Sequence, residues 1–333
     1  MTSLDTVAFR RWDRSRISGF LIVRGPLLVF VVLLVYMALS SPFFLEGRNI
    51  ASILRQSAPD AILAMGLAAV VMAGGDDIVV GGIDISIPAA SVLGVAIMAD
   101  LLTAGDAPLG VAFLLAALAV LAVGVVNALL VEGIGLTPLL ATLATSVAVV
   151  GITRWVTNNR RITVENAVIS QIRDGSVLGV PIPALIMVVT FGIVGFWLHR
   201  TRFGLRLQAV GGSRSAAEMS GLSTRKYIAS SFIIASGAAV VASVVLIARG
   251  SGMSPGIEQQ LLLDMVLATF VGAAFSSRRV VTIPGALLGA VLVKALSIGF
   301  QLLNVDIFKV GMVKGVLILF VVATAAVDSR ESQ

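Results

Sequence analysis

Few residues in this chain are of the types that do chemistry, and most of them interrupt apolar segments. The 333 residues include no cysteine and a single histidine, His199, which excludes thiolate chemistry and multi-histidine metal sites. The chain has no Gly-x-x-x-x-Gly-Lys-[Ser/Thr] phosphate loop, so it cannot hydrolyse ATP alone. An intramembrane serine hydrolase needs a serine facing a histidine, whereas His199 lies beside Arg200 at the end of an apolar segment. We therefore expect no enzyme activity, no metal and no cofactor in this chain.

The segment from Gly74 to Pro88 contains two glycine pairs, a proline and several acids. Glycine and proline interrupt helices, and irregular backbone at membrane depth is tolerated only beside protein or a cavity. One interpretation is a gate in which Asp84 and Ser86 line a path for a solute. The alternative is a loop in which either residue caps the next helix. We predict that three polar residues inside later apolar segments also line this path: Asn127, Thr142 and Thr145. The alternative is that they form hydrogen bonds between helices.

The elements that must position these residues are apolar helices. Hydrophobic residues make up 58% of the chain, charged residues only 13%, and the mean hydropathy is +1.03, whereas a soluble domain carries about 25% charged residues. Stretches such as Leu109 to Val131 are apolar on all sides, which excludes the alternation of a β-barrel strand. We predict an all-α polytopic membrane protein of about ten transmembrane helices with broken glycine-rich helices. The predicted spans are 25–41, 58–73, 87–103, 108–131, 137–156, 182–199, 228–249, 261–276, 281–301 and 308–327.

Basic residues set the predicted orientation. An even number of spans places both termini on one side, and that side then receives 14 of the 24 lysines and arginines against 8 on the other. We predict an N-in, C-in topology with a cytoplasmic segment 1–24, one permease domain 25–327 containing an inner loop 200–227, and a cytoplasmic tail 328–333. The first span is retained in this interpretation, and a cleaved signal peptide is the alternative.

The inner loop contains a predicted short helix. Ser213 is placed to cap a helix over 215–220 that Gly221 ends. Ala216, Ala217 and Met219 are predicted to form a small apolar face, which a purely solvated loop has no reason to carry. The alternative is a basic loop that only sets the topology.

Several short motifs occur in an order that resembles one family. They are Leu54-Arg-Gln-Ser57, Gly81-Gly-Ile-Asp-Ile-Ser86, Thr137-Pro-Leu-Leu-Ala-Thr-Leu-Ala-Thr145, Thr201-Arg-Phe-Gly204, Ala209-Val-Gly-Gly-Ser-Arg-Ser-Ala-Ala-Glu-Met-Ser-Gly-Leu222, Ala248-Arg-Gly-Ser251 and Gly285-Ala-Leu-Leu-Gly289. This series is similar to the ribose-type ABC importer permeases over roughly Phe43 to Val327.

The resemblance implies an inner-membrane permease subunit that moves a monosaccharide or related polyol by alternating access. It implies a second permease chain, ABC ATPase subunits or a double-ATPase chain that bind ATP and Mg, a periplasmic or extracellular sugar-binding protein, surrounding lipid, and no nucleic acid. We favour a heterodimer, because Arg278, Arg279 and Val281 stand where the family has glycines. The residues that the resemblance assigns to ATPase coupling are Arg206, Ser213, Ala216, Ala217, Glu218 and Gly221.

Two lysines inside predicted spans raise another function, a proton-coupled secondary transporter of a small polar solute. Lys294 lies about seven residues from the outer end of its predicted span, and Lys314 lies about six residues from the outer end of its own. At a rise of 1.5 Å per residue, both are roughly 10 Å below that end. From that depth both side chains can reach outward to the membrane surface, and the alternative is that they face the path. The acids considered as proton carriers, Glu132 and Asp264, lie near predicted helix ends.

Overall fold

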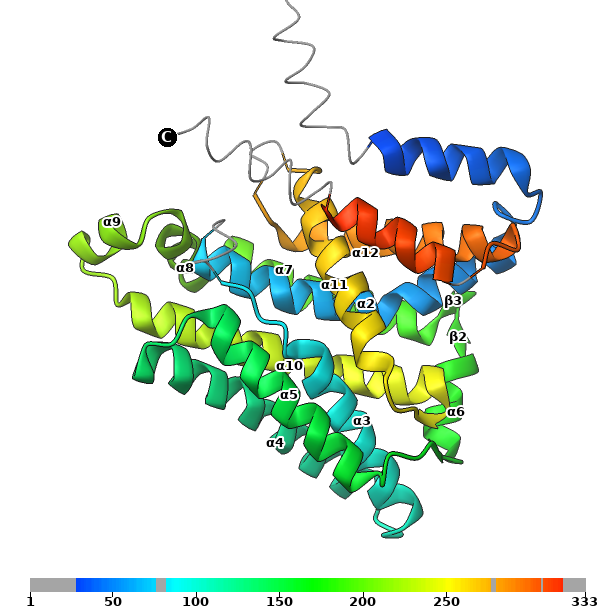
Figure 1. The fold of residues 1–333 in the computed structure, drawn as a ribbon, viewed down its shortest axis with the longest axis horizontal. Helices are drawn as coiled ribbons and strands as arrows, with labels where there is room; N and C mark the ends of the chain where they lie inside the picture. The colour runs from blue at the N-terminus through cyan, green and yellow to red at the C-terminus, as the bar shows by residue number, and fades with distance from the viewer. Residues whose placement is uncertain (1–27, 76–81, 277–279, 307, 320–333) are drawn as a thin grey trace, which may run out of the picture.

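A computed structural model describes residues 28–75, 82–276, 280–306 and 308–319. In these ranges the chain is a bundle of helices (Figure 1). They are a helix over Leu28–Ser40, α2 (Gly47–Gly74), α3 (Ile87–Thr103), α4 (Leu109–Ala128), the π-helix η1 (Leu129–Ile134), α5 (Pro138–Val156), α6 (Ala167–Asp174), α7 (Ile182–Arg200), α8 (Arg202–Gly212), α9 (Arg214–Met219), α10 (Thr224–Gly250), α11 (Ile257–Ala273), α12 (Ile283–Leu302) and a helix over 308–319. The predicted segments 1–24 and 328–333, together with Arg278 and Arg279, lie outside the described residues.

Six of the described helices are long and apolar enough to cross a membrane, judged by length and composition: α2, α4 with η1, α5, α7, α10 and α12. The helix over Leu28–Ser40 and α3 are apolar but shorter. The remaining predicted spans coincide with α11 and the helix over 308–319. The all-α membrane class is thus confirmed, while ten crossings and their orientation stay a prediction.

Helix α2 lies at the centre of the bundle. It packs against α7, α8, α10, α11 and α12, and 94% of the residues in its most apolar window are buried. It begins eleven residues before the predicted span 58–73, because its first turns carry polar side chains such as Arg48 and Arg55 that hydropathy does not recognise. The buried core is therefore built around α2, which other helices of the same chain surround on most sides.

Helices α4, α5 and α7 lie at the periphery. In each of them only 28% of the most apolar window is buried. Large apolar side chains such as Leu118, Val147 and Phe196 are more than half exposed there. Apolar surface of this extent requires lipid or another apolar chain as its neighbour.

The two ends of the bundle differ in structure. Figure 1 shows α8 and α9 at one end and α6 with β2 and β3 at the opposite end. Strand β1 (Ile162–Thr163) pairs antiparallel with β4 (Gly252–Met253), and β2 (Ser176–Val177) pairs with β3 (Val180–Pro181). These short ribbons close the connections at the α6 end.

The inner loop holds one more helix than the sequence predicts. Helix α8 begins after Thr201, whose hydroxyl accepts from the Gly204 amide at 3.3 Å, and it buries Leu207 and Val210. Gly211 lets α8 lie against the end of α2, because a Cβ there would meet the Met72 carbonyl oxygen. The prediction of a single helix in this loop was wrong, because α8 gains its stability from packing on α2.

Candidate functional site

Three of the predicted pathway residues form one buried hydrogen-bonded group. The Asp84 Oδ1 atom accepts from the Ser86 amide at 2.8 Å and from the Ser86 hydroxyl at 2.6 Å. The Asn127 Nδ2 atom, on α4, donates to the Ser86 Oγ atom at 2.8 Å and lies 3.5 Å from Asp84 Oδ2. At most 2% of each residue is exposed. This group, here called the gate cluster, ties the non-helical start of α3 to α4.

Thr142 of α5 adds a second tie to the same backbone segment. Its hydroxyl accepts from the Ile85 amide at 3.4 Å and lies 3.4 Å from the Ile83 carbonyl oxygen, besides donating to Pro138 of its own helix at 2.9 Å. Thr145, in contrast, donates to the Ala141 carbonyl oxygen at 2.9 Å within α5. The structure therefore brings four of the five predicted pathway residues together and leaves Thr145 outside the cluster.

The polar groups of the gate cluster form hydrogen bonds with one another. The Asp84 carboxylate accepts from Ser86 two residues on, which is the turn that aspartate commonly forms before a helix. The turn lies before α3, whose N-cap residue Ser86 makes no capping hydrogen bond with its side chain. A contact between these residues and a solute stays a prediction. The hydrogen bonds of the cluster can hold the non-helical segment before α3 against α4.

We expect Asp84→Ala to lower the free energy of unfolding by about 1–3 kcal/mol, because the buried amide and hydroxyl of Ser86 lose their acceptor. Chemical unfolding of the purified chain in detergent, followed by circular dichroism, measures the loss. Ser91→Ala is the matched control, since it removes a buried α3 hydroxyl that donates only to the nearby Pro88 carbonyl oxygen. Equal losses in both variants would contradict the role given to Asp84.

A cavity of about 400 Å³ opens beside this segment, between α3, α5 and α11. Ile85 and Pro88 form one wall of the cavity. Its other lining residues are Ala89, Ser146, Val147, Val150, Gly151, Arg154, Glu258, Gln259 and Leu262. The volume lies in the range that holds small ligands, and the lining combines aliphatic surface with a few polar groups.

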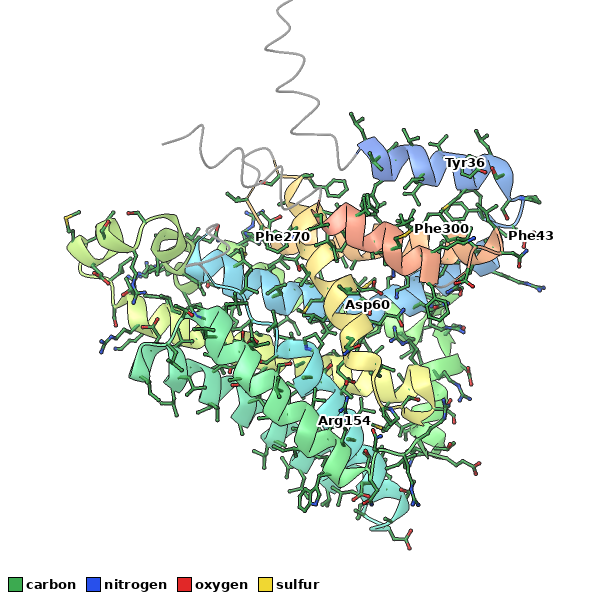
Figure 2. The ribbon with its side chains drawn as sticks, viewed as in Figure 1. Tyr36, Phe43, Asp60, Arg154, Phe270 and Phe300 are labelled. Carbon is green, nitrogen blue, oxygen red and sulfur yellow. The ribbon has the colours of Figure 1, made fainter. Side chains whose placement is uncertain are left out.

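Sequence reasoning missed the polar residues of this cavity. Ser146 and Arg154 lie on the same face of α5, with the apolar Val150 between them, because the three residues are spaced four apart. This spacing was the signal in the sequence that could have placed the two polar residues together. Figure 2 labels Arg154 near the α6 end of the bundle. Glu258 and Gln259 lie in the first turn of α11, just before the predicted span 261–276, where nothing local indicates a cavity.

The predicted short helix of the inner loop is confirmed in position. Helix α9 follows Ser213, whose hydroxyl accepts from the Ala216 amide at 3.3 Å, and it is followed by Gly221 in the left-handed region at φ +79°. The predicted apolar docking face was wrong in part. Ala217 is 5% exposed and faces this chain, whereas Met219 is 84% exposed.

Four other residues assigned to coupling lie on the exposed surface of α8, α9 and the turn after it: Arg206, Ala216, Glu218 and Gly221. Only Ala216 therefore shares an exposed surface with Met219 as predicted, because a six-residue helix lying on the bundle must turn one side inward.

The family described as the permease component of the branched-chain amino acid transport system matches residues 49–322. The chain belongs to this permease family. No solved structure matches it.

Curated relatives of this permease cover nearly its whole length. The ribose import permease protein RbsC of Bacillus subtilis (strain 168) is 31% identical over 311 residues, which are 93% of this chain and 94% of the relative. RbsC of Escherichia coli (strain K12) is 29% identical over 324 residues, 96% of this chain and 97% of the relative. The L-arabinose ABC transporter permease protein AraH of Azospirillum brasilense is 29% identical over 299 residues, 90% of this chain and 86% of the relative.

The permease also carries a buried group of charged side chains, here called the charge cluster. The Lys294 Nζ atom lies 2.6 Å from Asp60 Oδ2 and 3.2 Å from Asp264 Oδ2. The Lys314 Nζ atom lies 2.6 Å from Asp264 Oδ1, and Arg249 Nη1 lies 3.7 Å from Asp60 Oδ1. Figure 2 shows Asp60 in the interior of the bundle, where α11 crosses α2. The cluster joins α2, α10, α11, α12 and the helix over 308–319.

The expectation that Lys294 and Lys314 reach outward was wrong. They are 7% and 4% exposed, and their ammonium groups pair with the buried carboxylates of Asp60 and Asp264. Sequence reasoning missed Asp60, although an acid directly after Pro59 inside a predicted span was a signal of its own. A cavity of about 140 Å³ lies against Asp60, Asp264 and Lys294.

Proposed function

We propose that this permease is the transmembrane subunit of an ATP-driven ABC importer for a monosaccharide or related polyol. The observation that carries the proposal is its similarity, over at least 90% of its length, to permeases named for ribose and L-arabinose import. The six candidate spans support a multi-pass membrane protein, and we place it in the cell inner membrane.

The proposed mechanism is alternating access without a covalent step. In the N-in, C-in orientation with ten crossings, the α8 and α9 end faces the cytoplasm, and a binding protein delivers the solute at the α6 end. The 400 Å³ cavity beside Ile85 and Pro88 would contribute to a path between two permease chains. Its mixture of aliphatic walls and few polar groups supports passage rather than tight retention, which transport requires.

The partners complete this assembly. ATPase subunits, or a double-ATPase chain, bind ATP and Mg and contact the exposed side of α8 and α9. A second permease chain forms the other half of the path, and we keep the heterodimer as the proposed assembly. Val281, which stands where the resemblance implies a glycine, is only 5% exposed. The valine side chain is therefore packed inside this chain.

Uptake into proteoliposomes tests the function. We expect radiolabelled ribose or arabinose to enter only when the whole complex, the loaded binding protein and ATP are present, because the chain has no phosphate loop of its own. A protonophore should leave this uptake unchanged. Uptake driven by a pH gradient without ATPase would instead establish a proton-coupled carrier, the function that the buried acids Asp60 and Asp264 favour.

A further inference from the structure

The end of α4 near α9 has an unusual backbone. Its last turns widen into the π-helix η1, and Gly135 then turns the chain in the left-handed region at φ +88° towards α5. The Leu136 amide donates back to the Leu130 carbonyl oxygen at 3.0 Å. π-helical turns are rare and often accompany functional sites, because they displace one side chain from regular α-helical packing.

Glu132 on η1 is paired with α9. Only 9% of its side chain is exposed, and its Oε2 atom lies 3.5 Å from an Nη atom of Arg214, the first residue of α9. The Arg214 Nε atom also lies 3.6 Å from Glu218 on α9 itself, and Glu218 accepts from the Thr224 hydroxyl at 2.8 Å. One guanidinium group thus joins a nearly buried carboxylate of the bundle to an exposed carboxylate of the short helix.

The same elements hold the gate cluster. Asn127, which donates to Ser86, lies five residues before Glu132 on the continuous α4 and η1 helix. Thr142, which contacts Ile83 and Ile85, lies in the first turns of α5, which follows η1 after three residues. The segment 83–86 is therefore held from two sides by two helices, of which α4 runs into η1 and α5 begins shortly after it.

We propose that the Arg214–Glu132 ion pair transmits the movement of α9 through η1 to the gate cluster. The inference rests on the proposed function, because an ATPase partner must move α9. Arg214 and Glu132 are positioning residues: they touch no solute and no nucleotide, and they act through α4 and α5 on segment 83–86. The nearly buried position of Glu132 makes the link effective, since that carboxylate is costly to leave without its cation.

Coupling measurements on the complete complex test the proposal. We expect Glu132→Gln to reduce the solute taken up per ATP by about fivefold or more, a change typical of coupling between linked sites, while basal ATP hydrolysis and ATPase co-purification stay unchanged. Arg214→Gln should reduce the solute taken up per ATP by a similar factor. Glu132→Arg combined with Arg214→Glu should restore part of the uptake. Lys226→Gln is the matched control, since it removes one exposed basic charge at the same end of the bundle.

The absence of cysteine allows a direct measurement at the gate. Ile85→Cys places one thiol on the 400 Å³ cavity, and a hydrophilic thiol reagent should label it at a rate that changes when ATP is added. In the Glu132→Gln background we expect this ATP response to disappear. An unchanged ATP response, or loss of ATPase co-purification in Glu132→Gln, would overturn the proposal, the latter because the pair would then serve docking. Lack of ATP-driven uptake by the unaltered complex would instead refute the proposed function.

Discussion

Replacing Asp264 by asparagine is expected to lower the free energy of unfolding by about 3–5 kcal/mol, because the buried ammonium group of Lys314 then loses its carboxylate. Asp264 is bound by Lys294 and Lys314, whereas Asp60 pairs with Lys294 and Arg249. Lys314 would be left with no described carboxylate inside an apolar bundle. Chemical unfolding of the purified chain in detergent measures the change.

Two controls separate this effect from a general loss of charge. Asp174→Asn removes an exposed carboxylate whose hydrogen bond with Arg173 lowers its pKa, and water replaces that partner, so no measurable change is expected. Asp264→Leu combined with Lys314→Leu removes both partners, leaves the Asp60–Lys294 pair intact and should recover most of the loss. If Asp264→Asn alone leaves stability unchanged, the charge cluster does not stabilise the bundle.

The second large effect is expected for Gly289→Val, which should cost about 1–3 kcal/mol or prevent folding, because the added atoms overpack a contact between two backbones. A Cβ on Gly289 would meet the Ala268 carbonyl oxygen of α11, and Gly285 lies equally close to Gly272. These neighbours are main-chain atoms, so α11 and α12 must separate for the side chain to fit. Unfolding in detergent and the yield of monodisperse protein measure the result.

The matched control is Gly315→Val. Gly285-x-x-x-Gly289 and Gly311-x-x-x-Gly315 are the same motif in the sequence, yet a Cβ on Gly315 would have no described atom within 4 Å. We expect Gly315→Val to leave the unfolding of the chain unchanged. Equal losses in the two variants would show that the α11 and α12 contact is not what distinguishes the motifs.

The sequence by itself determined the features that depend on neighbouring residues. The apolar segments, the break between Gly74 and Pro88, and the capped helix after Ser213 all follow from hydropathy, backbone preference and side-chain capping. Each of these properties acts within a few residues of the chain. The order of motifs along the chain was sufficient to indicate the permease family.

Only the tertiary structure decided which side chains meet. Lys294 and Lys314 find Asp264 across 30 and 50 residues, Glu132 finds Arg214, and one of two identical glycine motifs packs closely while the other stays open. These outcomes depend on how each helix is rotated about its axis and which helices become neighbours. A helix that is apolar on all sides carries no periodic signal for its rotation, so partners far apart in the chain are determined only when the whole bundle packs.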